Sequence, residues 1–121
     1  MNKDLKNELS PLAYKVTQEH GTEPPFSGEY HDFSESGDYH CVCCDAMLFH
    51  SKEKFFSSCG WPAFSQALEQ STNEIIDNSH NMQRVEVLCK NCDAHLGHKF
   101  KDGPTGTRYC INSVCLNFIP K

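Results

Sequence analysis

The sequence has no long apolar run and no excess of positive charge. No stretch of its 121 residues approaches the roughly 18 consecutive apolar residues of a membrane-spanning helix. Residues 1–15 show neither the apolar core nor the small-residue cleavage site of a secretory signal. Sixteen acidic against eleven basic residues give a net charge of -5, which disfavours a general nucleic-acid binder. We therefore expect a cytoplasmic protein that binds neither membranes nor nucleic acid.

Tryptophan occurs only once, and low-complexity tracts and domain linkers are absent, but the chain contains eight cysteines. We expect one domain covering residues 1–121, which is enough chain to bury a core without disulfides. In a reducing compartment, cysteines bind metals or carry out redox chemistry more often than they form structural disulfides. The chemistry of this protein is therefore expected to depend on its cysteines.

The N-terminal part is expected to form one short helix and an extended arm. Residues 4–20 carry a loose apolar stripe of helical period. Ser10 suits the N-cap with Pro11 as the first helical residue, and Gly21 suits the end of the helix. Residues 21–33, rich in glycine and proline, are expected to lie extended on the body of the protein.

From residue 39 onward the pattern predicts short strands separated by turns, with one more short helix at residues 62–68. The expected strands are residues 39–42, 47–49, 73–76, 83–88, 99–100, 107–112 and 116–119.

Two C-x-x-C pairs, Cys41 with Cys44 and Cys89 with Cys92, predict a metal site. Two cysteines three residues apart can chelate one ion from a tight turn, and two pairs supply the four thiolates of a structural zinc site. The long interval between the pairs suggests that they join distant parts of one sheet. With all four positions filled by thiolates, the zinc has no open position for catalysis, so a zinc hydrolase or lyase is disfavoured.

A rival ligand set keeps the second pair and adds His95 and His98, which continue its spacing of three. It leaves the first pair unexplained, so we prefer the four-cysteine set. Cys43, inside the first pair, is expected to be a bystander. A zinc-ribbon-like binding module also explains the four cysteines, but it gives no role to the remaining motifs.

The stretch Arg108-Tyr-Cys110-Ile-Asn112-Ser places a thiol between a cation and an amide. In a strand, residues two apart point to the same side, so these three side chains can share one face. A nearby cation lowers the pKa of a thiol and favours the reactive thiolate. The pattern makes Cys110 a candidate nucleophile, while a buried, metal-bound or disulfide-bonded cysteine stays open at this point.

Two further stretches carry candidate functional residues. His95 and His98, followed by Asp102 in a run expected to be rich in loops, form a candidate acid–base group. Cys59 and Trp61 lie in a Gly-Trp-Pro turn, where the indole can either pack in the core or form the wall of an apolar pocket.

Five segments resemble, in order and spacing, the B-type methionine sulfoxide reductases, which reduce the R epimer of methionine sulfoxide. The segments are GTEPPFSGEY, CVCCDAMLF, KFFSSCGWPAF, CKNCDAHLGHKFKDGP and GTRYCINSVCLNF. The resemblance runs from about residue 10 to residue 119. It implies a mainly β fold in which two antiparallel sheets form a partly open barrel, with a short N-terminal helix and a structural zinc site. It also implies a monomer that acts on methionine-R-sulfoxide in oxidised proteins, and possibly on the free amino acid.

The resemblance carries over to single positions. It implies Cys110 as the catalytic nucleophile and Cys59 as the resolving cysteine, with thioredoxin or a similar dithiol as the reductant. His95 or His98, held by Asp102, is expected to donate a proton to the sulfoxide oxygen. The implied zinc ligands are Cys41, Cys44, Cys89 and Cys92, and the implied pocket residues are Trp61, His95, His98, Asp102, Arg108 and Asn112.

The chain departs from the family pattern at a few positions. Ser58 replaces a glycine that is common before the resolving cysteine, Ala63 replaces a common serine, and Lys99 stands where an aliphatic residue is frequent. Cys115 is an additional thiol, so Cys115 or Cys43 stays open as an alternative resolving cysteine.

Overall fold

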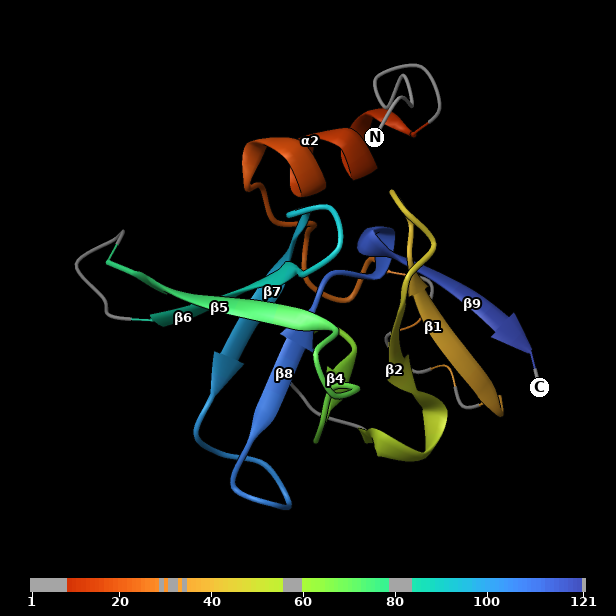
Figure 1. The fold of residues 1–121 in the computed structure, drawn as a ribbon, viewed down its shortest axis with the longest axis vertical. Coiled ribbons are helices and arrows are strands. Elements are labelled where there is room, and N and C mark those ends of the chain that lie inside the picture. Colours follow the sequence, from red (N-terminus) through yellow and green to blue (C-terminus); the bar gives the residue numbers. More distant parts are fainter. Residues whose placement is uncertain are drawn as a thin grey trace.

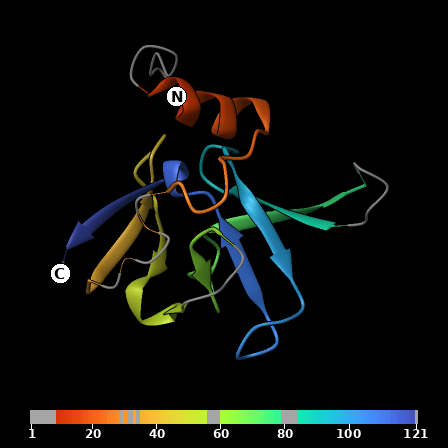
Figure 2. The ribbon, with the colours of Figure 1, turned by 180° about the vertical axis from the view of Figure 1, so that it is seen from behind.

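In the computed structural model, residues 9–28, 30, 33, 35–55, 60–78 and 84–120 are described. They form two antiparallel sheets and one α-helix (Figures 1 and 2). The smaller sheet has the strand order β2-β1-β9 and the larger β3-β4-β8-β7-β6-β5. The helix is α2 (Pro11–Glu19), and the strands are β1 (Gly37–Cys41), β2 (Met47–His50), β3 (Lys54–Phe55), β4 (Ala63–Phe64), β5 (Thr72–Asp77), β6 (Arg84–Cys89), β7 (His95–Phe100), β8 (Arg108–Ile111) and β9 (Leu116–Pro120).

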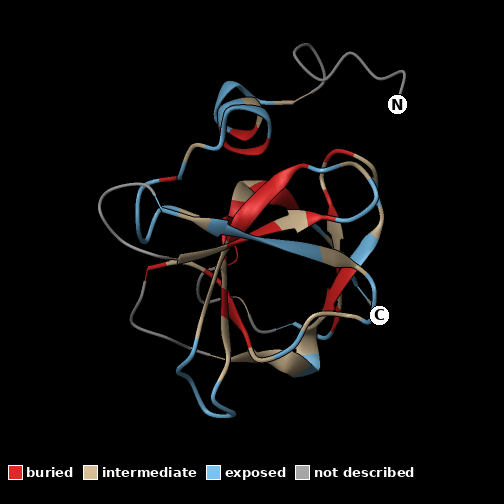
Figure 3. Cartoon of the chain, turned by 60° about the vertical axis from the view of Figure 1, so that its left-hand side comes forward, coloured by how far each residue is buried: buried red, intermediate tan, exposed pale blue. Residues whose placement is uncertain are grey.

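The predicted fold class is confirmed: the protein is mainly β, with two antiparallel sheets that do not close into a complete barrel and one short helix. Aromatic side chains join the two sheets. Phe49 of β2 stacks on Phe64 of β4 with ring centroids 4.3 Å apart, and Tyr39 of β1 meets Phe64 edge-on at 5.1 Å. All three side chains are fully buried. The core therefore lies between the sheets, where Figure 3 shows buried residues gathered.

Helix α2 begins as the sequence predicts. The Ser10 hydroxyl accepts a hydrogen bond from the backbone N–H of Ala13 at 3.1 Å, and Pro11 is the first helical residue. The helix ends one residue earlier than expected, because His20 takes the left-handed conformation (φ 56°) predicted for Gly21. Residues 4–8 of the expected helix lie outside the described residues. Within the described part of the chain, no helix has the length and apolar character needed to cross a membrane.

The expected arm lies on the body of the protein where it is described. The Glu23 carboxylate accepts a hydrogen bond from the backbone N–H of Val114 at 3.0 Å. The backbone N–H of Tyr30 donates to the Ser113 hydroxyl at 3.0 Å. Both partners lie directly after β8, so the arm is anchored next to the strand that carries Cys110.

Two local expectations are wrong. Residues 62–68 contain no helix: Ala63 and Phe64 form strand β4, because they pair with Cys110 and Tyr109 of β8. The run of residues 95–104, expected to be rich in loops, is a strand in its first part: β7 covers His95–Phe100 between β6 and β8, whereas residues 101–104 contain bends and turns as expected. In both places, pairing with distant strands outweighed the local turn signals.

Candidate functional site

Strand β8 places Cys110 in the middle of the larger sheet. Burial alternates along the strand, with Tyr109 and Ile111 buried and Arg108 and Cys110 partly exposed, so the latter two share one face as predicted. Cys110 pairs with Ala63 on β4 and with His98 on β7. A backbone held by strands on both sides gives the thiol a fixed position.

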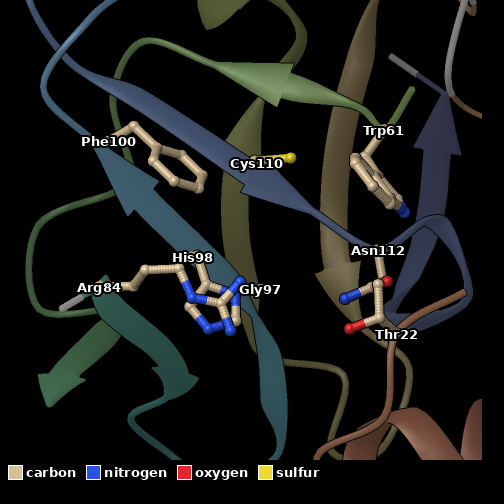
Figure 4. A pocket seen from close by; sticks show the side chains of 8 residues that line it. All are labelled: Thr22, Trp61, Arg84, Gly97, His98, Phe100, Cys110 and Asn112. Carbon is tan, nitrogen blue, oxygen red and sulfur yellow. The ribbon is translucent and has the colours of Figure 1, made fainter. Parts of the chain in front are cut away.

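Cys110 opens into a cavity of about 80 Å³. Its lining consists of Thr22, Trp61, Arg84, Gly97, His98, Phe100, Cys110 and Asn112. Figure 4 shows the Cys110 sulfur between the rings of Phe100 and Trp61. The structure thus brings four of the sequence-predicted site residues, Cys110, Trp61, His98 and Asn112, to one small cavity.

The N-terminal arm holds two of these residues. The Trp61 indole N–H donates to the Glu23 carbonyl at 3.0 Å, and the Asn112 side-chain carbonyl accepts from the Glu23 N–H at 3.0 Å. The Asn112 amide also donates to the Leu96 carbonyl at 2.9 Å. The Glu23 backbone therefore holds two residues of the cavity lining, a role that the sequence did not reveal beyond the prediction of an arm.

Each histidine of the predicted pair contacts its own carboxylate. His98 Nε2 lies 3.0 Å from Asp77 Oδ2, and His95 Nδ1 lies 2.7 Å from Glu86 Oε2. The two rings meet edge-on at 5.6 Å. Burial lowers the pKa of His95, and the hydrogen bond to Glu86 only partly opposes that shift.

The two histidines differ in position. His98 lines the Cys110 cavity, whereas His95 lines the adjacent hollow. Sequence reasoning missed Asp77 and Glu86. The available signal was an acidic residue inside a strand-forming run, such as Glu86 in RVEVLC, because a buried carboxylate requires a partner.

Asp102 does not hold either histidine, which corrects the sequence expectation. Its carboxylate accepts two hydrogen bonds from the Arg108 guanidinium, at 2.7 and 3.2 Å, and these hold the pKa of Asp102 below its usual value. Arg108 also stacks over the Phe100 ring, 4.4 Å from its centroid. Asp102 and Arg108 are absent from the cavity lining, although Arg108 contacts Phe100, which is part of it.

The remaining cysteines have different accessibilities. Cys59 and the adjacent Ser58 lie outside the described residues. Cys115 is fully buried in a short 3-10 turn (Ser113–Cys115), where its thiol donates to the His95 carbonyl at 3.2 Å and burial raises its pKa. Cys43 is also fully buried. Burial makes both residues poor candidates for attack on a Cys110 intermediate at the cavity.

Four cysteines form a cluster that can hold a metal ion. The sulfur atoms of Cys41, Cys44, Cys89 and Cys92 all lie within 4.8 Å of one another. Cys41 and Cys92 sulfurs are 3.7 Å apart, and Cys44 and Cys89 sulfurs are 3.6 Å apart. A tetrahedron with metal–sulfur bonds of about 2.3 Å has sulfurs about 3.8 Å apart. The donor set therefore fits a single tetrahedral ion.

The two C-x-x-C turns have the same backbone design. The N–H groups of Cys41 and Cys89 donate to the carbonyls of Ala46 and Ala94, at 2.8 and 2.9 Å. In each turn the aspartate after the second cysteine is left-handed, with φ of 65° and 64°. Each turn follows a strand, β1 of the smaller sheet or β6 of the larger. The cluster thus joins two sheets, so the expectation that it joins parts of one sheet is wrong.

Comparisons with known proteins agree with this architecture. The family model described as SelR domain matches residues 9–120. A protein of Chromohalobacter salexigens named peptide methionine sulfoxide reductase MsrB is 54% identical, over 97% of this chain and 91% of its own length. Proteins of the same name are 56% identical in Escherichia coli O45:K1 (95% of this chain, 86% of theirs) and 55% identical in Thioalkalivibrio sulfidiphilus (97% and 88%).

The fold is also similar to that of a solved structure titled as the Mis18 "Yippee-like" domain. The TM-score is 0.59 at 16% identity, with 72% of this chain and 98% of that chain covered. At this identity the similarity shows a shared fold alone.

Proposed function

The chain belongs to the SelR-domain family, and from that premise we propose that it reduces methionine-R-sulfoxide to methionine with Cys110 as the nucleophile. The observation that carries the proposal is the cavity lined by Cys110, Trp61, His98 and Asn112. A thiol in a small cavity, beside an indole and a group able to transfer a proton, matches what sulfoxide reduction requires. The sulfur needs an attacking thiolate, and the oxygen needs a proton before it can leave.

The first step joins Cys110 to the substrate. Its thiolate attacks the sulfoxide sulfur while His98, held by Asp77, donates a proton to the sulfoxide oxygen. We assign this role to His98 rather than His95 because His98 lines the Cys110 cavity and pairs with Cys110 across the strands. Acid catalysis of this kind contributes on the order of 10² to 10⁴ in rate.

The pocket walls orient the substrate. The Trp61 ring contacts the S-methyl group, and the Asn112 amide lies on the side of the sulfoxide oxygen. The hydroxyl group is then transferred from the substrate sulfur to the Cys110 sulfur as the substrate S–O bond breaks, so methionine leaves with its sulfur reduced by two electrons and Cys110 is left as a sulfenic acid. Arg108, stacked on Phe100 and paired with Asp102, supplies a fixed positive charge on the Cys110 face of β8.

The second step regenerates the enzyme. Cys59 attacks the sulfenic acid, water leaves, and a Cys59–Cys110 disulfide forms. An external dithiol such as thioredoxin reduces that disulfide by exchange, and the chain acts as a monomer throughout. Protein-bound methionine-R-sulfoxide is the proposed substrate, with the free amino acid as the smaller alternative.

The metal in this proposal is a structural zinc ion. Cys41, Cys44, Cys89 and Cys92 would hold it, and their soft thiolate donors and tetrahedral spacing favour zinc. Zinc bound in this way would cross-link the two C-x-x-C turns and would take no part in the reaction.

The function is tested by supplying each sulfoxide epimer separately with dithiothreitol as reductant. Reduction of the R epimer alone supports the proposal. Reduction of neither epimer, or of the S epimer alone, overturns it.

The resolving step is tested separately with Cys59→Ser. This variant should release about one methionine per enzyme and then stop with thioredoxin, because the sulfenic acid has no thiol partner. Cys43→Ser is the matched control and should cycle normally. Normal cycling of Cys59→Ser would move the resolving role to another thiol.

A further inference from the structure

A second cluster of metal-binding side chains lies next to the Cys110 cavity. His20, Glu86 and His95 each offer one ligand atom, and these atoms lie within 4.8 Å of one another. They line a hollow of about 360 Å³, whose full lining is His20, Thr22, Asp77, Arg84, Glu86, His95 and His98. We infer that His20, Glu86 and His95 form a second cation site, which takes a divalent transition-metal ion such as Zn²⁺, Ni²⁺ or Co²⁺.

The donor set decides the class of ion. Glu86 Oε2 lies 2.5 Å from His20 Nδ1 and 2.7 Å from His95 Nδ1, so two imidazoles converge on one carboxylate. Imidazole nitrogens with a carboxylate suit zinc, nickel, cobalt and copper, whereas magnesium and calcium prefer oxygen donors alone. Three protein ligands also leave a position for water, unlike the closed four-cysteine cluster.

His95 points to a ligand independently of this spacing. Its side chain is only 2% exposed, and its Nε2 atom has no hydrogen-bond partner among the described residues. A neutral imidazole that donates from Nδ1 to a carboxylate leaves Nε2 as a bare acceptor. A buried bare nitrogen is costly without a partner, so the described residues alone do not fully satisfy the polar groups of this cluster.

Charge and access also favour a cation. With the three histidines neutral, Glu86 and Asp77 contribute two negative charges and Arg84 one positive charge, so the lining has a net charge of -1. The His20 side chain is 59% exposed at the end of α2, whereas Glu86 and His95 are buried on β6 and β7. An exposed ligand beside two buried ones gives the ion a path from solvent.

Occupation of this site should slow the reductase. The ion would add positive charge close to His95 and His98, whose rings are 5.6 Å apart, in a hollow that shares His98 with the Cys110 cavity. This consequence rests on the proposed function, whereas binding of the ion does not.

Binding is tested by titrating the zinc-loaded protein with Co²⁺, followed by absorption and calorimetry. We expect one further equivalent per chain, with visible bands of nitrogen and oxygen ligation and without sulfur charge-transfer bands. His20→Asn should weaken this affinity by at least about tenfold. Asparagine tolerates the left-handed backbone at position 20, so the variant is expected to fold.

His50→Ala is the matched control, because His50 contacts a single carboxylate, Asp38, away from this hollow. It should bind Co²⁺ as the unaltered protein does. Absence of a second equivalent, equal affinity in His20→Asn, or bands of sulfur ligation would each overturn the inference.

The functional consequence has its own measurement. Zn²⁺ should inhibit reduction of methionine-R-sulfoxide, a chelator should reverse the inhibition, and His20→Asn should resist it while keeping normal activity without added metal. Equal inhibition of both proteins would place the ion on Cys110 and overturn the regulatory role. If the protein has no reductase activity, the proposed function is wrong, but the Co²⁺ titration still tests whether the second cation site exists.

Discussion

The Cys110 sulfur is the atom on which the proposed reaction depends. We expect Cys110→Ser to reduce turnover of methionine-R-sulfoxide to background, because a serine hydroxyl is a far weaker nucleophile than a thiolate. The metal ion of the four-cysteine cluster should stay bound, since that cluster does not include Cys110. Turnover assays and metal analysis of the same preparation check both statements.

Cys43→Ser serves as the matched control, because Cys43 is buried next to the cluster but is not one of its four cysteines. It should keep both activity and metal. If Cys110→Ser still turns over methionine-R-sulfoxide, Cys110 is not the nucleophile.

Glu23 gives the fold a pH dependence that can be measured. Burial raises its pKa above 4.5, against the hydrogen bonds from Val114 and Ser113. A raised pKa means that the folded state holds the proton more tightly than the unfolded state. Its contribution to stability is therefore fully present below pH 4.5 and is lost as the pH rises through the raised value.

Glu23→Gln removes this titration, because glutamine is neutral at every pH. The melting temperature of the variant minus that of the unaltered protein should be higher at pH 7 than at pH 4. Glu69→Gln, at an exposed position, is the control and should show no such trend. Equal differences at both pH values for Glu23→Gln would contradict the prediction.

Single residues were predictable where motifs carried them. Cys110, Trp61, His98 and Asn112 were named from the sequence, and they line one cavity. Their supporting residues were not predictable. Asp77, Glu86 and Glu23 reach the site only through the β5–β6–β7 register and the path of the arm, neither of which the residue spacing reveals. Asp102 was misassigned because closeness in sequence to His98 suggested a contact, whereas the turn after β7 directs it to Arg108.

Among the elements, the contact between β7 and β8 is the most restrictive. A Cβ atom added to Gly97 would lie 2.0 Å from the Cys110 carbonyl oxygen, so the two strands would have to separate. We expect Gly97→Ala to lower the free energy of unfolding by about 1–3 kcal/mol. It should lower kcat/KM as well, because His98 and Cys110 are paired across the same two strands. Thermal unfolding and steady-state kinetics measure the two effects.

Gly106→Ala is the control for Gly97→Ala, because it introduces backbone strain without a steric clash. Gly106 has a φ of 87°, but an added Cβ would meet no atom within 4 Å. Alanine there should cost about 1 kcal/mol of stability through backbone strain and leave kcat/KM unchanged. Gly97→Ala with normal stability and kinetics would show that β7 and β8 are not tightly coupled.

The strands themselves were largely predictable, because alternation of apolar residues survives in the sequence. Strand β6 is the clearest case, since a strand was expected at residues 83–88 and is observed at Arg84–Cys89. Strand β4 was mistaken for a helix because its two residues owe their conformation to β8. The division into two sheets was not visible in the strand pattern, because pairing between distant segments leaves no local signal, and it came from the family resemblance.

For the whole molecule, the cysteine cluster is the point where the two sheets are tied together. Cys41 ends β1 of the smaller sheet, and Cys89 ends β6 of the larger. A metal ion at the cluster would cross-link the sheets at the ends of these strands, in addition to the aromatic contacts between Phe49, Phe64 and Tyr39. Its loss is therefore expected to weaken the whole fold rather than a single turn.

We expect Cys89→Ser to lose the metal ion and to lower the melting temperature by on the order of 10 °C or more. Binding to structural thiolate sites is worth about 10–16 kcal/mol in small peptides, and loss of even about 3 kcal/mol shifts a domain of this size by that amount. Both sheets should unfold in one transition at the lower temperature, because the core lies between them. Cys43→Ser, which leaves the four ligands intact but places a hydroxyl at a buried position, should keep its metal ion and lose less stability than Cys89→Ser. If Cys89→Ser keeps its metal content, the four-cysteine cluster is not the binding site. If Cys89→Ser loses the metal ion but melts at the same temperature, the aromatic core alone holds the two sheets together.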